Sequence, residues 1–494
     1  MSVVEGGREP RRSIRRNILA LLSSQVATWG LSTVTLVMLP RYLGPVALGE
    51  LRVSSSLWAV VVVVAGCGTG SLLTIEVAKR KQQAIPLAAA VGRTRTSAFL
   101  ALVPLAAGFC FLAGYEAKLI VIITIGGVAA ILDLVVMGSK RAALMGAEEM
   151  GAVARVDVAT TILSVTAVAI ALPLGAGVLP IALLGDVGSL FGAILFGRAL
   201  RSVGQPADHK PLFRGRRLLR AGMPFLFADA MVTIYLQVDT LVISVLVGER
   251  DLGWYSTADG IFGSLLFVPA VLMSAVFPSI AAMHDRTPTA VAGRLEQAFR
   301  SMLLFGVWIG LGTVLVSRSL TSLLFGAKFS GTSPVLATFG VVAILSFQTI
   351  LLGQFAIATG RARFIGVLLL VSTVLSLPLD LLLIRWTERR YGNGAIGGAL
   401  AYIVTELIQI VCGVIVLAPY LLSRTTLARV VRCVVAGAAL LAAGWPFRDD
   451  FFLVSLATGS VAFFVALLIM RAFDEFELDQ ARVALRWLNH SRSQ

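Results

Sequence analysis

Long apolar runs separated by short polar segments dominate this sequence of 494 residues. A helix needs about twenty apolar residues to cross the hydrocarbon core of a bilayer. On that criterion the pattern predicts an all-α integral membrane protein with fourteen transmembrane helices. The predicted spans are residues 18–39, 54–73, 96–114, 118–137, 156–174, 178–197, 222–247, 257–281, 302–317, 334–358, 364–384, 396–417, 427–445 and 451–472.

A glycine pattern between the first two apolar runs is repeated later in the chain. Residues 41–51 contain Gly44 and Gly49, with a proline directly after the first glycine, and the same glycine spacing returns 204 positions later at Gly248 and Gly253. Glycine allows the sharp backbone turn that returns the chain across the membrane, so we interpret all four glycines as turn or hinge residues. Two copies at equivalent places indicate a duplicated chain.

The composition agrees with a membrane protein and argues against other classes. Hydrophobic residues make up 57% of the chain, charged residues make up 14%, and the mean hydropathy is +0.89. The net charge of +15 is concentrated in short loops, so we expect no nucleic-acid partner. The four cysteines lie inside apolar runs and the three histidines lie far apart, which predicts neither a disulfide nor a metal site. We find no acidic metal-binding motif and no large extramembrane domain, and therefore expect no enzymatic activity.

Loop charge predicts the orientation of the chain. With a cytoplasmic N-terminus, 32 of the 42 lysines and arginines fall on the cytoplasmic side. This bias follows the positive-inside rule, so both termini are predicted to be cytoplasmic. The external loop around Arg385, Arg389 and Arg390 runs against the trend.

The longest internal linker divides the chain into two six-helix repeats, followed by two further helices. Six spans return the chain to the cytoplasmic side, so the repeats are predicted to be parallel. The predicted segments are a basic N-terminus (1–17), an N-lobe (18–197), a linker (198–221), a C-lobe (222–417), two last spans (418–472) and an amphipathic tail (473–494).

Polar residues follow one face of the first and the seventh predicted spans. The 204-residue offset places Gln25 on Asp229 and Trp29 on Thr233, which suggests that both helices line one central cavity. The alternative is that these side chains only bond to neighbouring helices. An arginine beside the first turn is a further candidate, because its guanidinium matches phosphate oxygens. The candidate cavity residues are Gln25, Trp29, Ser32, Arg52, Asp229, Thr233 and Gln237.

Three acids lie inside predicted spans of the second repeat without an obvious basic partner. Asp239, Asp380 and Glu406 are candidates for cation coupling, by binding Na⁺ or exchanging a proton. The alternative is that Asp239 and Asp380 lie shallow enough to be hydrated. No other cofactor is expected.

An ordered series of short motifs resembles a known superfamily. The motifs occupy residues 40–49, 237–258, 277–279, 324–329, 358–361 and 391–399. They resemble those of the multidrug/oligosaccharidyl-lipid/polysaccharide (MOP) exporters, and most closely the polysaccharide flippase (Wzx-like) branch. The resemblance implies a V-shaped, two-lobed bundle whose central cavity opens alternately to each side of the bacterial cytoplasmic membrane.

The resemblance also implies a function in the biosynthesis of surface polysaccharides such as lipopolysaccharide or exopolysaccharide. The expected substrate is a lipid-linked oligosaccharide, such as an undecaprenyl-pyrophosphate repeat unit. Besides membrane lipids, a polymerase or chain-length protein is an expected partner. In the lipid II flippase branch, the last two helices form a groove for the lipid tail and acids of the second lobe couple a cation. By position, Asp239 and Asp380 correspond to those acids. We expect a glycan repeat unit rather than lipid II, because the first lobe shows few arginines inside its spans.

Two other functions remain open at this point. A cation-coupled drug antiporter of the same superfamily would share the fold. A non-transporting scaffold of a polysaccharide assembly complex would share the membrane topology but not the cavity.

Overall fold

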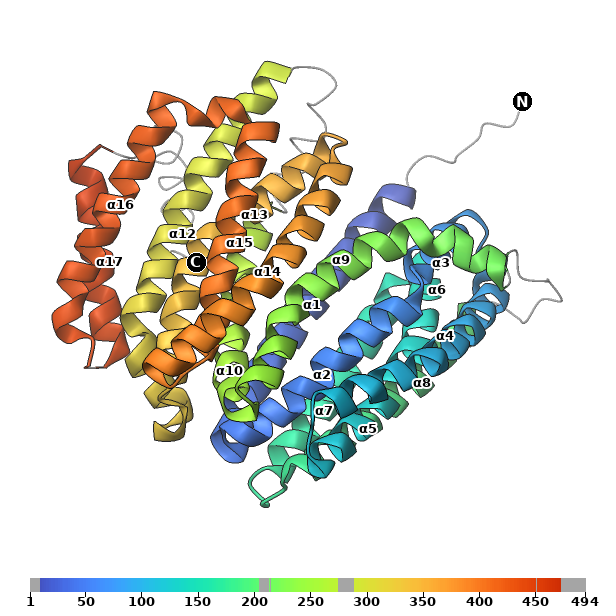
Figure 1. Ribbon diagram of the computed structural model, residues 1–494. Coiled ribbons are helices and arrows are strands. Elements are labelled where there is room, and N and C mark those ends of the chain that lie inside the picture. Colours follow the sequence, from blue (N-terminus) through green and yellow to red (C-terminus); the bar gives the residue numbers. More distant parts are fainter. Residues whose placement is uncertain (1–8, 204–212, 214, 274–287, 450, 472–494) are drawn as a thin grey trace, which may run out of the picture. The chain divides into compact units, whose positions relative to one another are not determined.

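The computed structural model describes residues 9–203, 213, 215–273, 288–449 and 451–471, and these contain helices without any strand. The first helices are α1 (Glu9–Leu43), α2 (Pro45–Gly66), α3 (Thr69–Lys79), α4 (Ala84–Leu112), α5 (Ala117–Ile131), the π-helical η2 (Leu132–Met137), α6 (Gly138–Gly146), α7 (Met150–Ala171), α8 (Val178–Val203), α9 (Arg216–Leu246) and α10 (Glu249–Leu265). They are followed by α12 (Pro288–Phe325), α13 (Thr332–Ala358), α14 (Ala362–Tyr391), α15 (Ala395–Leu417), α16 (Arg424–Gly444) and α17 (Phe452–Ile469) (Figure 1).

Thirteen helices of the described chain are long and apolar enough to cross a membrane. They coincide with the predicted spans from the second onward, which confirms the all-α membrane fold. The first predicted span corresponds to α1, a helix of 35 residues that is not among the thirteen. The predicted tail at 473–494 lies outside the described residues.

The chain divides into two compact units. One consists of the chain up to Thr257 together with Leu369–Gly398, and the other of Ala258–Leu368 together with the chain from Ala399 onward. In the first unit, α1 packs against α7, and α2 packs against α4, α5 and α9. In the second unit, α12 packs against α13, α16 and α17. The lobe boundary at 198–221 stays a prediction, because compactness groups α9 with the preceding helices.

Each unit has an apolar core. In the first unit Leu87, Leu144 and Phe196 are fully buried where α4, α6 and α8 meet. In the second unit Phe347 and Phe463 are fully buried against α12 and its neighbours. These cores fix the helices that carry the polar residues described below.

Only two of the four repeated glycines form turns. Gly44 has φ +80° between α1 and α2, and Gly248 has φ +89° between α9 and α10. Gly49 and Gly253 lie inside α2 and α10, so their prediction as turn residues is wrong. A Cβ atom on Gly49 would lie 1.8 Å from the carbonyl oxygen of Glu249, and one on Gly253 would lie 1.9 Å from that of Pro45. Their function is to let α2 and α10 touch main chain to main chain.

Polar contacts reinforce this end of the first unit. The Tyr115 hydroxyl, in the connection between α4 and α5, lies 2.7 Å from the Ser244 hydroxyl of α9. Since Ser244 donates its proton to the carbonyl of Leu241, Tyr115 is the donor to Ser244. Burial raises the pKa of Tyr115, so its phenol keeps the donated proton at neutral pH. Lys118 also bonds both carboxylate oxygens of Glu50, at 2.6 and 2.9 Å.

Candidate functional site

A cavity of about 420 Å³ lies inside the first unit, between the end of α2 and helices α3, α4, α6 and α9. We call it the Arg95 cavity. Its charged residues are Arg95, Arg141 and Asp229, and its remaining polar side chains are Ser71 and Thr74. Glycines make up much of the rest of the wall, which leaves main-chain groups accessible to a ligand.

The cavity forms where one predicted membrane helix is broken. The span predicted at 54–73 is two helices, because Cys67 and Gly68 both adopt the left-handed conformation between α2 and α3. A Cβ atom on Gly68 would lie 2.2 Å from the carbonyl oxygen of Gly222, so α9 crosses directly over the break. The first turn of α3 starts at Thr69, beside the cavity. Unpaired N–H groups at a helix start favour anions, and broken membrane helices use them in this way.

Arg95 is the most constrained charged group at this cavity. It is 5% exposed, and its hydrogen bonds to described residues all go to neutral groups: Nε to Thr69 at 2.9 Å, and Nη1 to the Leu134 carbonyl at 2.9 Å and to Ser139 at 3.4 Å. Leu134 belongs to the π-helical segment, a distortion that is common at functional sites. Among the described residues no carboxylate pairs with Arg95. A buried cation held by neutral groups alone is costly, and an anionic ligand in the cavity would offset that cost.

The guanidinium of Arg95 keeps one nitrogen available. Nη2 has no hydrogen-bond partner among the described residues, and a Cβ atom on Gly70 would lie only 3.2 Å from it. The absence of a side chain at Gly70 thus leaves Nη2 open toward the cavity wall. The other bonds fix the plane of the group, which leaves a rigid donor for an incoming oxygen.

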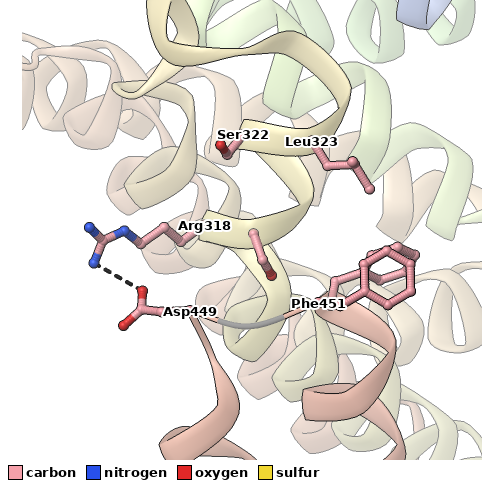
Figure 2. A pocket seen from close by; sticks show the side chains of 7 residues that line it. Arg318, Ser322, Leu323, Asp449 and Phe451 are labelled. Carbon is pink, nitrogen blue, oxygen red and sulfur yellow. Dashed lines mark ion pairs between the residues drawn. The ribbon is translucent and has the colours of Figure 1, made fainter.

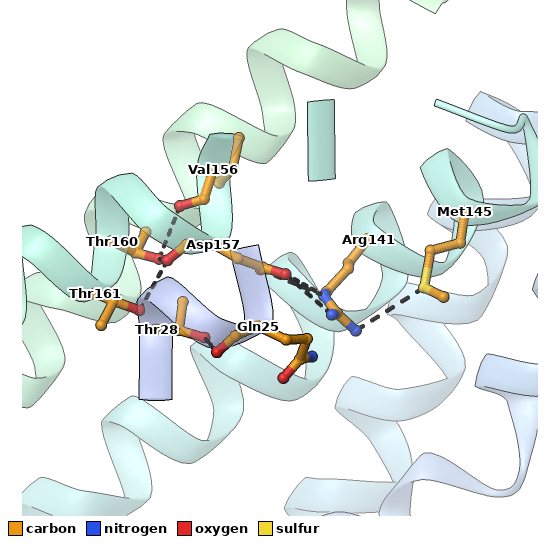
Figure 3. Close-up of polar contacts among 8 residues, drawn as sticks. All are labelled: Gln25, Thr28, Arg141, Met145, Val156, Asp157, Thr160 and Thr161. Atoms are coloured by element: carbon orange, nitrogen blue, oxygen red, sulfur yellow. Dashed lines mark hydrogen bonds and ion pairs between the residues drawn. The ribbon is translucent and has the colours of Figure 1, made fainter. Parts of the chain in front are cut away.

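Arg141 is held by an acid on the neighbouring helix. Its Nη2 lies 3.0 Å from Asp157 of α7 and its Nε lies 3.3 Å from the same oxygen, so the ion pair is forked. Figure 3 shows this pair together with Gln25 of α1, the helix that packs against α7. The carbonyl of Gln25 accepts a hydrogen bond from Thr28 at 3.0 Å. Arg141 is therefore partly neutralised, whereas Arg95 is not.

The structure brings only one of the predicted cavity residues into the Arg95 cavity. Asp229 of α9 lines it, on the same helix as the partly buried Thr233 and Gln237. Gln237 has a buried side-chain oxygen without a hydrogen-bond partner among the described residues. The remaining predicted residues are located on other surfaces: Gln25, Trp29 and Ser32 are exposed on α1, and Arg52 is partly buried on α2.

Two of the three predicted coupling acids lie together in the first unit. Asp380 of α14 is fully buried and its carboxyl faces that of Asp239 on α9. Neither oxygen of Asp380 receives a hydrogen bond from a described residue, whereas Asp239 accepts one from the Tyr255 hydroxyl at 3.1 Å. Two adjacent buried carboxylates repel unless a proton or cation lies between them. Their oxygens and nearby hydroxyl groups suit Na⁺ or a shared proton.

The third acid belongs to the other unit. Glu406 of α15 is 4% exposed and accepts a hydrogen bond of 2.6 Å from Thr349 of α13. The neighbouring Gln348 is also buried, and neither atom of its amide has a partner among the described residues. This arrangement is a separate polar cluster inside the second unit.

The second unit also has a hollow of about 430 Å³ between α12 and the start of α17. Its two charged residues are Arg318 and Asp449, which pair at 3.2 Å (Figure 2). Phe451 and Phe452 line its other side. Because its charges balance within the pair, this hollow offers little attraction to an anion compared with the Arg95 cavity.

Comparison with known families identifies the chain. The family described as polysaccharide biosynthesis protein matches residues 14–284, more than half of the chain. The chain belongs to this family. A search of curated protein sequences gave no match.

Solved structures show a shared fold at low sequence identity. The lipid II flippase MurJ in an inward closed conformation is 14% identical with a TM-score of 0.73, covering 92% of this chain and 98% of MurJ. A multidrug resistance MATE family transporter of the MOP superfamily is 15% identical with a TM-score of 0.62, covering 78% and 94%. A MOP superfamily transporter from Pyrococcus furiosus is 15% identical with a TM-score of 0.53, covering 84% and 98%. This polysaccharide biosynthesis protein is thus a multi-pass membrane protein with the fold of MOP transporters, and the resemblance noted in its sequence is confirmed.

Two arginines of the Arg95 cavity were not predicted from the sequence. Arg95 and Arg141 were counted as loop cations, because the apolar runs begin after the first and end before the second. The helices continue beyond those runs, as Lys81–Leu112 and Ala117–Gly146. Both arginines therefore lie within helices, although the predicted spans leave them out. The run of glycines at 66–70 was the available signal, since glycine-interrupted spans mark binding sites.

Proposed function

We propose that this protein translocates a lipid-linked oligosaccharide, carried on a polyprenyl pyrophosphate, across the bacterial cytoplasmic membrane. The observation that carries this proposal is Arg95, a buried cation at a cavity wall without a carboxylate partner among the described residues. Membership of the polysaccharide biosynthesis family supports a glycan as the cargo. No enzymatic step is required of the chain.

The cavity matches the two polar parts of such a substrate, the pyrophosphate and the sugars. The open nitrogen of Arg95 and the start of α3 suit the pyrophosphate, because guanidinium and N–H donors recognise phosphate oxygens. Ser71, Thr74 and Asp229 offer hydrogen-bond partners to sugar hydroxyls. The polyprenyl tail stays in lipid, so only the polar headgroup requires a protein path.

Movement of the cavity between the two sides requires the α2–α10 contact to open. Gly49 and Gly253 hold these helices together at one end of the first unit. Alternating access then consists of breaking this main-chain contact on the outer side after the headgroup has bound from the cytoplasm. This direction rests on the predicted topology with both termini in the cytoplasm.

Asp239 and Asp380 are proposed to couple this movement to a Na⁺ or proton gradient. A cation between the two carboxylates would hold α9 and α14 together, and its release would leave two repelling charges. The gradient thereby favours one conformation over the other. Glu406 is proposed to bind a cation or exchange a proton separately, within the second unit.

The drug antiporter receives less support from the cavity. A pocket for cationic drugs is expected to be acidic, but two arginines and one aspartate line this one. The expectation of a glycan repeat unit rather than lipid II stays a prediction, and Arg95 and Arg141 add two arginines to the first-lobe helices. The choice of a glycan repeat unit rests on the family.

Deletion of the gene in its native host tests the proposal. We expect lipid-linked oligosaccharide to accumulate on the cytoplasmic side, surface polysaccharide to be lost, and drug susceptibility to stay unchanged. Drug sensitivity with normal surface polysaccharide would instead establish the antiporter. A wild-type copy should restore the polysaccharide, whereas a copy with Arg95→Gln should not. Restoration of surface polysaccharide by the Arg95→Gln copy would favour a non-transporting scaffold of the polysaccharide assembly complex.

A further inference from the structure

A second basic pocket lies in the first unit, on the other side of α6. It has a volume of about 440 Å³ between the beginning of α4, the end of α8 and the η2–α6 helix. We call it the α4–α8 pocket. Its charged lining residues are Arg93, Lys140 and Arg201, and none of the described residues that line it is acidic.

Helix α6 separates the two pockets. Gly138 and Arg141 face the Arg95 cavity, whereas Ser139 and Lys140 face the α4–α8 pocket. The bond from Arg95 to Ser139 lies in the wall between them. The second pocket is therefore a distinct site and not an extension of the first.

Described residues do not neutralise the three cations. Among the described residues none of Arg93, Lys140 and Arg201 forms an ion pair with a carboxylate, and Lys140 and Arg201 repel each other. The Lys140 ammonium donates to the Ala193 carbonyl at 3.1 Å. A Cβ atom on Gly197 would lie 2.9 Å from that ammonium, so Gly197 provides the space that it occupies. Three positive charges that line one pocket, without a carboxylate partner among the described residues, favour an anion.

Apart from Thr96 and Ser139, the other side chains that line the pocket are apolar. Ile85, Val135, Val136 and Leu200 line it, and Ala88 and Ala89 add small apolar surface. The three helices are membrane-length, and the pocket lies at the ends that are predicted to be cytoplasmic. Apolar side chains beside cations at this depth match a lipid, with acyl carbon against the helices and phosphate at the cations.

We infer that the α4–α8 pocket binds the phosphate group of an anionic phospholipid from the inner leaflet. The site is independent of the transported substrate, since it lies outside the Arg95 cavity. A bound lipid would bridge α4, α6 and α8 and so stabilise the helices that form the cavity wall. The same cations also suit free inorganic phosphate, and the experiment separates the two sources.

The test measures lipid binding to the purified full-length protein by native mass spectrometry. Phosphatidylglycerol should bind at least about tenfold more tightly than phosphatidylcholine. The triple variant Arg93→Gln, Lys140→Gln and Arg201→Gln should lose this preference. The matched control is Arg216→Gln, Arg217→Gln and Arg220→Gln, which removes the same charge from exposed positions on α9 and should keep it.

A second variant keeps every charge. Gly197→Leu fills the pocket and displaces the Lys140 ammonium, so it should weaken phosphatidylglycerol binding by about tenfold while the net charge is unchanged. The inference would be overturned if the α9 control lost as much phosphatidylglycerol binding as the pocket variants. It would also be overturned if neither pocket variant lost any phosphatidylglycerol binding. Inorganic phosphate that displaces the lipid at equal concentration would also overturn it, by showing that the lipid is not required. None of these measurements depends on transport, so they remain informative if the proposed function fails.

Discussion

Gly49 and Glu249 meet main chain to main chain, with no room for a single methyl group between α2 and α10. The contact joins equivalent parts of the two predicted repeats, because Gly253 meets Pro45 in the same way. The repeated glycine pattern therefore has two functions. Gly44 and Gly248 form turns, whereas Gly49 and Gly253 form two matching contacts between α2 and α10. The opening of these contacts is required by the proposed transport cycle.

Replacement of Gly49 by alanine should separate these helices. We expect Gly49→Ala to lower the free energy of unfolding by about 1–3 kcal/mol, the usual cost of overpacking. The measurement is thermal unfolding of the purified protein. Gly263→Ala on α10 is the control, because nothing lies within 4 Å of its added methyl. The control should be neutral or stabilising by up to about 1 kcal/mol, and an equal loss in both variants would contradict the contact.

The ion pair between Glu50 and Lys118 predicts an asymmetric result. The Glu50 side chain is 8% exposed and that of Lys118 is 53% exposed. Lys118→Gln leaves a buried carboxylate without its partner and should cost about 3 kcal/mol. Glu50→Gln leaves a cation that reaches water and should cost about 1 kcal/mol or less. The loss of unfolding free energy in each variant is measured by thermal unfolding. Equal losses in the two variants would show that Glu50 is hydrated.

The pair of Asp239 and Asp380 predicts dependence on cations. In the wild type, added Na⁺ or a lower pH should raise the unfolding temperature, because each neutralises the two carboxylates. Asp380→Asn should raise the unfolding temperature without added cation and abolish that dependence. Asp449→Asn, which removes an exposed acid, should leave the dependence intact. A variant at Asp380 that responds to cations like the wild type would exclude the pair as the coupling site.

The apolar pattern predicted the helices well and their polar ends poorly. The second span was placed at 54–73, whereas α2 begins at Pro45. Glu50 and Arg52 resembled loop residues, and only the fold shows that Lys118 neutralises Glu50. Local sequence does not reveal a partner that lies 68 positions away.

The site was predicted only in part for the same reason. Asp239 and Asp380 were selected as acids inside spans, and their contact depends on how α9 and α14 pack. Arg95 is indistinguishable in sequence from a cytoplasmic loop arginine. Its importance comes from Thr69 and Ser139, which lie on other helices and are brought to it by tertiary packing.

Transport of a lipid-linked oligosaccharide in reconstituted vesicles tests the central claim most directly. The measurement compares the wild type, Arg95→Gln and the exposed control Arg217→Gln at equal amounts of folded protein. Loss of charge-assisted bonds to pyrophosphate costs about 1.5–3 kcal/mol, so Arg95→Gln should slow translocation at least about tenfold. Arg217→Gln should match the wild type. Translocation by Arg95→Gln at the wild-type rate would contradict the proposal that this cavity carries the headgroup.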